Sequence, residues 1–153
     1  MKKPKKPSRS KLVAKLDRLF SLYIRLNYSD DEWFCKCFTC WKKMKRNDKD
    51  CSCWHRIKRD VQFLRRNKNN ARPQCMRRCN SKLAGNGEQL IFRRNLIQDV
   101  WIKEVESMED QYIEYRKDIT KFKVYDFQIE EMIEEYKQLV KDLAEKKNIE
   151  IKI

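Results

Sequence analysis

Two pairs of cysteines in the middle of the chain have the spacing of metal ligands. The first pair is Cys37 and Cys40, and the second is Cys75 and Cys79. Two residues between cysteines is typical of a zinc knuckle, in which a tight turn points both thiolates at one ion. The second pair is spaced more widely, but at the start of a helix residues four apart lie on one face, so these thiolates can also converge. We therefore predict one structural Zn²⁺ ion with four thiolate ligands.

The chain has seven cysteines, an odd number, and this favours metal binding in a reducing compartment over disulfides. Three of them, Cys35, Cys51 and Cys53, lie outside the two pairs. Any one of the three could replace a predicted ligand, and Cys51 with Cys53 is the chief competitor.

The single histidine, His55, lies between the cysteine pairs, and Asn70 and Asn80 flank the second pair. An imidazole with a pKa near ~6.5 suits a general base that activates water. A lone histidine is, however, more often a surface or capping residue. Asn70 could equally be a turn former and Asn80 a helix or turn cap.

The net charge of +14 is distributed unevenly along the chain. Residues 1–30 contain nine Lys and Arg and two Asp and Glu, and residues 31–94 contain eighteen and six. Residues 95–153 contain ten and fifteen, so the last part is acidic. Because the basic surplus coincides with the cysteine region, we expect a surface that binds a polyanion, with nucleic acid favoured over a merely solvated basic surface.

Apolar periodicity predicts helices on both sides of the cysteine region. Residues 10–27, 90–108 and 126–143 carry apolar side chains at helical spacing, and Ser10 is a plausible N-cap. Residues 33–80 lack this period until the second cysteine pair, so we expect short strands and loops organised by metal. Two glycines and three prolines are too few for a β-sandwich or barrel.

The expected fold is mainly α, with a small α+β zinc-bound core, an N-terminal helix and long C-terminal helices. We expect a disordered basic tail over residues 1–9, a nucleic-acid-binding domain over 10–94 and a helical extension over 95–153. The apolar stripes of the helices are expected to pack in the core, with dimerisation as the alternative. No apolar stretch is long enough to cross a membrane, and no apolar run follows the first lysines, so we expect neither a membrane span nor a signal peptide.

Three tryptophans, Trp33, Trp41 and Trp54, lie close to the cysteines in the sequence. We expect them to pack in a small core beside the metal, with stacking on nucleic-acid bases as the alternative.

A longer pattern includes most of these residues: Cys53-Trp54-His55, Arg59, Arg65, Asn70, Gln74-Cys75, Cys79-Asn80 and Gly85-Asn86. This pattern resembles the NinG/Rap recombination proteins of lambdoid and related phages, and the resemblance extends over roughly residues 10–145. The core of that family is in turn similar to HNH (ββα-metal) nucleases on a treble-clef zinc scaffold.

The resemblance implies roles for individual residues. His55 would activate water against a phosphodiester, Asn70 would orient the histidine or its loop, and Asn80 would lie near a catalytic Mg²⁺ or Mn²⁺ ion. Arginines would contact phosphate, because the guanidinium fork matches its oxygens. The nucleic-acid-binding candidates are Arg59, Arg65, Arg66, Arg72, Arg77 and Arg78.

The function that the resemblance implies is a phage recombination endonuclease, which binds branched or junction DNA in the cytoplasm of a bacterial host. Symmetric cutting of two strands would suggest a homodimer. The alternative is a non-catalytic zinc-knuckle protein that binds DNA or RNA as a recombination accessory factor. It is favoured by Trp54 in place of the usual glycine and by Ser52 in place of the usual aspartate. A second rival is a helical interaction protein that works through residues 95–153.

Overall fold

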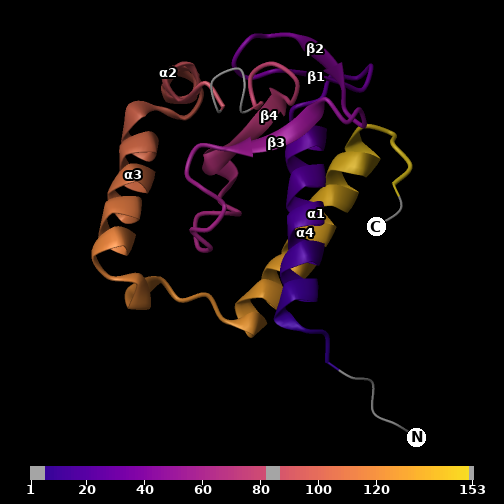
Figure 1. Cartoon of the computed structure of the whole chain (residues 1–153). Coiled ribbons are helices and arrows are strands. Elements are labelled where there is room, and N and C mark those ends of the chain that lie inside the picture. The colour runs from indigo at the N-terminus through magenta and orange to yellow at the C-terminus, as the bar shows by residue number, and fades with distance from the viewer. Residues whose placement is uncertain (1–5, 82–86, 152–153) are drawn as a thin grey trace, which may run out of the picture. The chain divides into compact units, whose positions relative to one another are not determined.

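A computed structural model of the chain describes residues 6–81 and 87–151. Within these ranges there are four α-helices and two small antiparallel sheets of two strands each. Figure 1 shows the elements in chain order: α1 (Arg9–Asn27), β1 (Phe34–Lys36), β2 (Lys43–Lys45), β3 (Cys51–His55), β4 (Ala71–Cys75), α2 (Gln89–Val100), α3 (Ile102–Lys117) and α4 (Asp126–Lys146). The mixed architecture agrees with the expected combination of helices and a small β core.

The chain divides into two compact units. One unit combines Met1–Tyr23 with Val124–Ile153, and the other is Ile24–Lys123. The first five residues of the expected basic tail and Gly85-Asn86, the last part of the family-like pattern, lie outside the described residues.

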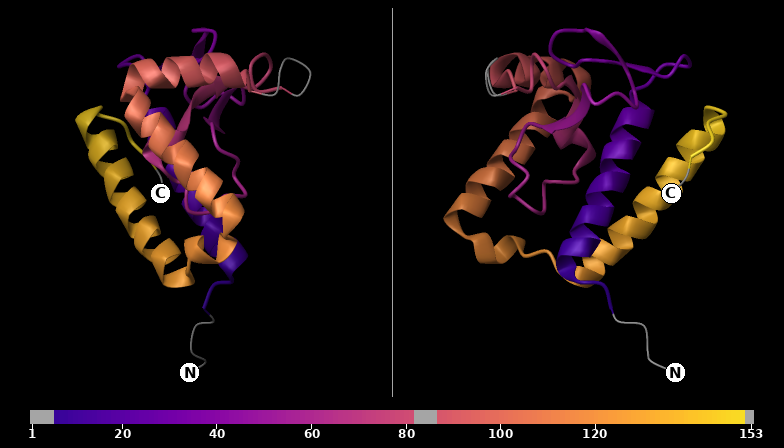
Figure 2. Two further views of the ribbon diagram at one scale, coloured as in Figure 1. Left: turned by 90° about the vertical axis from the view of Figure 1, so that its left-hand side faces the viewer. Right: turned by 45° about the vertical axis from the view of Figure 1, so that its right-hand side comes forward.

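In the first unit α1 and α4 run in the same direction, as Figures 1 and 2 show. Near their starts Arg9 forms an ion pair with Asp126. Further along, the ring of Phe20 meets the edge of Tyr136 at a centroid distance of 5.3 Å. The buried residues of α4 follow a helical period, as the sequence predicts: Ile129, Ile133, Tyr136, Val140 and Ala144. These two helices therefore bury apolar stripes, as expected for core packing.

The start of α1 differs slightly from the expectation. The backbone carbonyl of Ser8 accepts hydrogen bonds from the N–H groups of Lys11 and Leu12. The helix begins at Arg9, so Ser8 occupies the cap position, two residues before the predicted cap at Ser10.

In the second unit the two hairpins present the cysteines. β1 pairs with β2, and β3 pairs with β4, both antiparallel. In the second hairpin Cys51 lies opposite Cys75 and His55 lies opposite Ala71. All five residues of β4 are buried.

Helices α2 and α3 pack against the second hairpin and the long loop that connects its two strands. Their apolar residues form one buried cluster with the loop and the first hairpin: Phe38, Ile57, Val61, Leu64, Phe92, Leu96, Val105 and Met108. The helix predicted over 90–108 is interrupted, because Trp101 has a φ of 71° and separates α2 from α3. None of the helices in the described ranges combines the length and apolar character of a membrane span.

Candidate metal centre and nucleic-acid face

The four cysteines of the predicted metal site converge in the structure. Each Sγ atom of Cys37, Cys40, Cys75 and Cys79 lies within 4.8 Å of the others. The Sγ atoms of Cys40 and Cys75 are 3.7 Å apart. A tetrahedral zinc ion with Zn–S bonds of roughly 2.3 Å requires sulfurs about 3.8 Å apart. This group of thiols can therefore hold a metal ion such as zinc.

The first pair lies in the turn that connects β1 to β2. Within this turn the N–H of Trp41 donates to the carbonyl oxygen of Cys37 at 2.9 Å, and the N–H of Cys37 donates to the carbonyl of Lys42 at 2.8 Å. The turn is closed at both ends, so both sulfurs point to the same side, as the two-residue spacing predicts.

The second pair converges through a turn and not through the predicted start of a helix. β4 ends at Cys75, and a turn follows in which the N–H of Asn80 donates to the carbonyl of Cys75 at 3.0 Å. The carboxylate and carbonyl of Asp50 hold the same turn by accepting the N–H groups of Arg77 and Met76. Cys79 reaches the cluster because this turn folds back on the strand.

Backbone N–H groups point at the sulfurs and favour the thiolate form. The N–H of Cys75 donates to Sγ of Cys37 at 3.3 Å, and the N–H of Cys79 donates to Sγ of Cys75 at 3.4 Å. Burial raises the pKa of Cys37, and hydrogen bonds from the backbone N–H groups of Cys40 and Cys75 act against this shift. Burial and the neighbouring thiols of Cys75 and Cys40 also raise the pKa of Cys79. Four thiolates at this spacing need a cation among them, so the donor set fits a soft metal ion such as zinc.

The remaining cysteines lie outside this group. Cys35 and Cys51 form a separate buried pair, in which the hydrogen bond between the two thiols raises the pKa of Cys35 and lowers that of Cys51. The Sγ of Cys35 also donates to the carbonyl of Arg25 at 3.2 Å. Cys53 is half-buried on β3. In the part of the chain that the structure describes, no group of three or more Cys, His, Asp or Glu ligands other than the four cysteines converges.

The structure brings His55 and Asn70 together. His55 is the last residue of β3, its Nε2 atom is buried, and the next residue, Arg56, donates its N–H to the carbonyl of Asn70. Asn70 is fully buried, and its amide accepts the N–H of Ile57 and donates to the carbonyls of Ile57 and Leu64. Asn70 thus holds the loop that leaves His55, at the end of the hairpin away from the cysteines.

Asn80 lies at the other end of this hairpin. Its Nδ2 donates to Oγ of Ser52 at 2.9 Å, and Ser52 lies opposite Gln74 in the register. Because Ser52 and His55 are three residues apart on one strand, their side chains point to opposite faces. Cys51, opposite the ligand Cys75, is four residues from His55, which is about 13 Å along a strand.

The six arginine candidates divide by burial. Arg59, Arg77 and Arg78 are exposed, and Arg65 is half-buried with Nη1 on the carbonyl of Arg59. Arg66 is 5% exposed and donates to Oε1 of Gln62. The expectation that Arg66 contacts phosphate is therefore not met by its placement, because its side chain is enclosed by protein.

Arg72, also expected to contact phosphate, is only 1% exposed. Its guanidinium donates to Oδ2 of Asp99 at 2.5 and 2.8 Å and to the carbonyls of Lys68 and Ala71. Arg72 therefore joins β4 to α2 and faces no solvent. Sequence reasoning could not detect this role, because nothing in the local pattern separates this arginine from its exposed neighbours.

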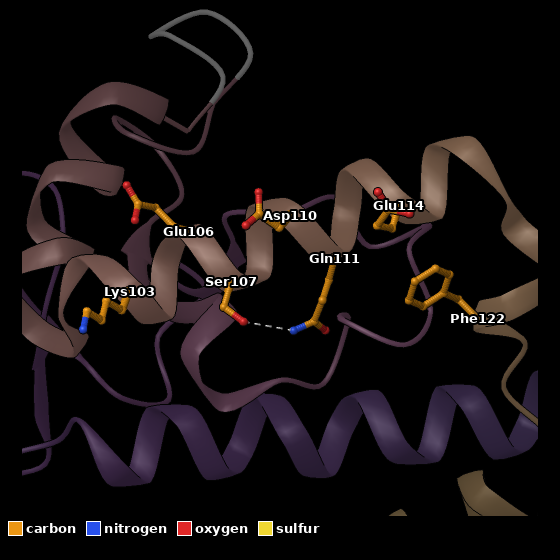
Figure 3. Close-up of a pocket in the computed structure, with 7 residues that line it drawn as sticks. All are labelled: Lys103, Glu106, Ser107, Asp110, Gln111, Glu114 and Phe122. Atoms are coloured by element: carbon orange, nitrogen blue, oxygen red, sulfur yellow. Dashed lines mark hydrogen bonds between the residues drawn. The ribbon is translucent and has the colours of Figure 1, made fainter.

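Helix α3 is acidic, whereas the cysteine region is basic. A hollow of about 420 Å³ lies along this helix, and Figure 3 shows Glu106, Asp110 and Glu114 spaced along it, with Phe122 near Glu114. Among the described residues, Lys103 is the one basic residue that lines it. This acidic surface would repel phosphate.

These observations define a class: a small protein whose central unit is built on two β-hairpins that bring four cysteines together as a metal-binding group, beside a basic surface. A model of the family described as Bacteriophage Lambda NinG protein matches residues 1–147 of the chain. The chain belongs to the NinG family. No curated protein and no solved structure matches it.

Proposed function

We propose that this protein binds branched or junction DNA during phage recombination and hydrolyses a phosphodiester bond there, in the cytoplasm of the bacterial host. Membership of the NinG family, together with a four-cysteine group beside the strand that ends in His55, is the observation that carries the proposal. Zinc would be structural in this reading and would hold a treble-clef-like scaffold, because four thiolates close the coordination sphere.

In the proposed reaction His55 acts as the general base that takes a proton from the attacking water. Asn70 acts as a positioning residue, because its three hydrogen bonds fix the loop that follows His55. Arg59 lies in this loop, and Arg77 and Arg78 lie in the turn beside the cysteines, so all three are available for phosphate.

The divalent ion implied by the family resemblance, Mg²⁺ or Mn²⁺, finds no ready site in the described residues. Asp50 is bound by Lys42 at 2.7 Å, and Asp48 accepts the N–H of Asp50. Asn80 faces Ser52 and not the side of His55. These residues do not form a carboxylate site for such an ion, so no step is derived through it.

This arrangement favours a second candidate function, a non-catalytic accessory factor that binds the same DNA. Asp50 already pairs with Lys42 and accepts the N–H of Arg77, so its carboxylate is engaged within the protein and not with a divalent ion. This supports the accessory factor. Incubating the zinc-loaded chain with labelled four-way junctions and Mg²⁺ or Mn²⁺ separates the two functions. Cleavage by the wild type that His55→Ala abolishes without loss of binding supports the nuclease. Binding without cleavage supports the accessory factor, and a lack of binding contradicts both.

A further inference from the structure

We infer that a pocket beside the first cysteine pair receives a single unpaired nucleobase, with Trp41 as its stacking surface. The inference rests on the proposed binding of branched DNA, and it specifies which part of that DNA the protein recognises. The pocket lies within the unit formed by Ile24–Lys123 and has a volume of about 560 Å³. This is the size range of small-ligand pockets.

Trp41 is placed at the pocket at a conformational cost. It follows Cys40 directly, its side chain is 60% exposed, and its φ is 61°. A bulky residue rarely adopts this left-handed conformation, whereas glycine adopts it freely. Trp33 and Trp101 are also exposed with a positive φ, but of these three tryptophans it is Trp41 that lines this pocket. Strained residues cluster at functional sites, and the pocket gives this one a ligand to meet. The backbone of Trp41 closes the turn of the first cysteine pair, but a glycine could close it without strain, so the turn does not explain the indole.

The other walls are aromatic and fixed in place. Tyr28, Phe34 and Phe38 line the pocket with Trp41. The guanidinium of the buried Arg72 lies 4.9 Å from the ring centroid of Tyr28 and 5.4 Å from that of Phe38. Because the buried guanidinium packs against both rings, their side chains lose little conformational entropy when a flat ligand binds.

The polar groups of the pocket match a base edge. Asn95 lines the pocket and donates its Nδ2 to the carbonyl of Phe38 at 2.6 Å, which fixes the orientation of its amide. Gln98 is exposed at the rim, and its amide forms no hydrogen bond with the described residues. Amide side chains offer a donor and an acceptor side by side, as the edge of a base requires.

The charges at the pocket favour a nucleotide over an acidic or apolar peptide. The two acids in its lining are already paired, Asp99 with Arg72 and Asp30 with Lys43, whose Nζ is 3.7 Å from the carboxylate. Lys36 is exposed in the lining and can meet the phosphate next to the base. A base in an intact duplex is stacked on both sides and cannot enter, so the ligand must be an unpaired base, such as one in a bulge or a single-stranded flap of branched DNA.

The test uses the full zinc-loaded chain and three labelled duplexes, of which one is fully paired, one has a single bulged adenosine and one has a bulged abasic nucleotide. Anisotropy titrations at one salt concentration should show the bulged adenosine bound roughly 5-fold or more tightly than the abasic bulge, the ratio expected for one stacked base. Trp41→Gly should abolish this preference and keep the zinc, and its melting temperature should not fall, because glycine accepts the φ of 61°.

Trp41→Phe should keep most of the preference. Trp101→Gly is the matched control, because Trp101 is 81% exposed with a φ of 71° and lies outside the pocket. Equal binding of the two bulges by the wild type, or an unchanged preference in Trp41→Gly, would overturn the inference and leave the proposed function standing. Failure to bind any of the three duplexes or a four-way junction would overturn both.

Discussion

The indole ring of Trp54 lies directly against the α-carbon of Gly87. A β-carbon at Gly87 would lie 2.1 Å from Cζ2 of Trp54 and 2.3 Å from Cε2. The indole cannot move aside easily, since it packs on Phe92 with ring centroids 4.5 Å apart. The carbonyl of Gly87 also accepts Nε2 of the buried Gln74 at 2.8 Å. This contact joins the segment before α2 to both strands of the second hairpin.

Gly87→Ala should therefore lower the free energy of unfolding by about 3 kcal/mol, because it overpacks the indole and requires a methyl-bearing residue at a φ of 94°. Urea unfolding followed by circular dichroism measures the change. In a Trp54→Leu background the same substitution should cost less, because the clash is relieved while the backbone strain remains. Equal losses in both backgrounds would contradict the proposed clash.

Glu109 on α3 should make stability depend on pH. Its Oε1 lies 2.8 Å from Nε of Arg93 and 3.0 Å from Nη2 of Arg56, and its pKa is held below the usual value, chiefly by the hydrogen bond from Arg93. A carboxyl with a lowered folded pKa stabilises the protein above its unfolded pKa and loses this contribution as pH falls through the folded value.

Glu109→Gln should therefore be less stable than the wild type by about 1 kcal/mol at neutral pH. The difference should close as the pH falls below about 4.5. Thermal unfolding of both proteins across this range measures it, and comparing them at each pH cancels the effect of acid on the metal site. Asp110→Asn is the control, because Asp110 is exposed and forms no ion pair with the described residues. If the stability difference between the two proteins persisted at acidic pH, it would not come from the ionised carboxylate of Glu109.

The sequence predicted the metal ligands and the helices because both depend on local spacing. A two-residue gap confines Cys37 and Cys40 to one turn, and the apolar period of α4 appears within a few turns of helix. The second pair was placed correctly as a group, although Cys75 and Cys79 meet through a turn held by Asp50. That turn depends on a residue 25 positions away, which no local pattern reveals.

Strand register and burial were not predictable in the same way. The pairing of β3 with β4 determines which faces of the hairpin Asn80 and His55 occupy. This pairing joins segments far apart in the chain, so a local pattern does not reveal it. The basic surplus indicated a polyanion-binding region, yet it did not separate the buried Arg72 from the exposed Arg77. The break at Trp101 was missed because its neighbours continue the apolar period.

The metal site predicts a sharp difference between two cysteine variants. Cys75→Ser removes one of four converging thiolates and should abolish stoichiometric zinc, with loss of cooperative unfolding because metal binding and folding are coupled. Cys53→Ser should keep about one zinc per chain, since Cys53 lies outside the cluster. Elemental analysis of dialysed protein gives the stoichiometry. Loss of zinc in Cys53→Ser with retention in Cys75→Ser would reverse the ligand assignment.

The exposed arginines predict how DNA binding responds to salt. If ~6 phosphates are neutralised, the logarithm of the binding constant should fall with the logarithm of salt concentration at a slope near −5. Arg77→Gln removes an exposed cation from the turn beside the cysteines and should reduce the magnitude of this slope by about 1. Arg116→Gln is the matched control, because Arg116 is equally exposed but lies on the acidic helix α3, and it should leave the slope unchanged. Titrations of a labelled four-way junction at several salt concentrations measure all three slopes. A smaller slope in Arg116→Gln, together with an unchanged one in Arg77→Gln, would place the DNA on α3 and away from the cysteine turn.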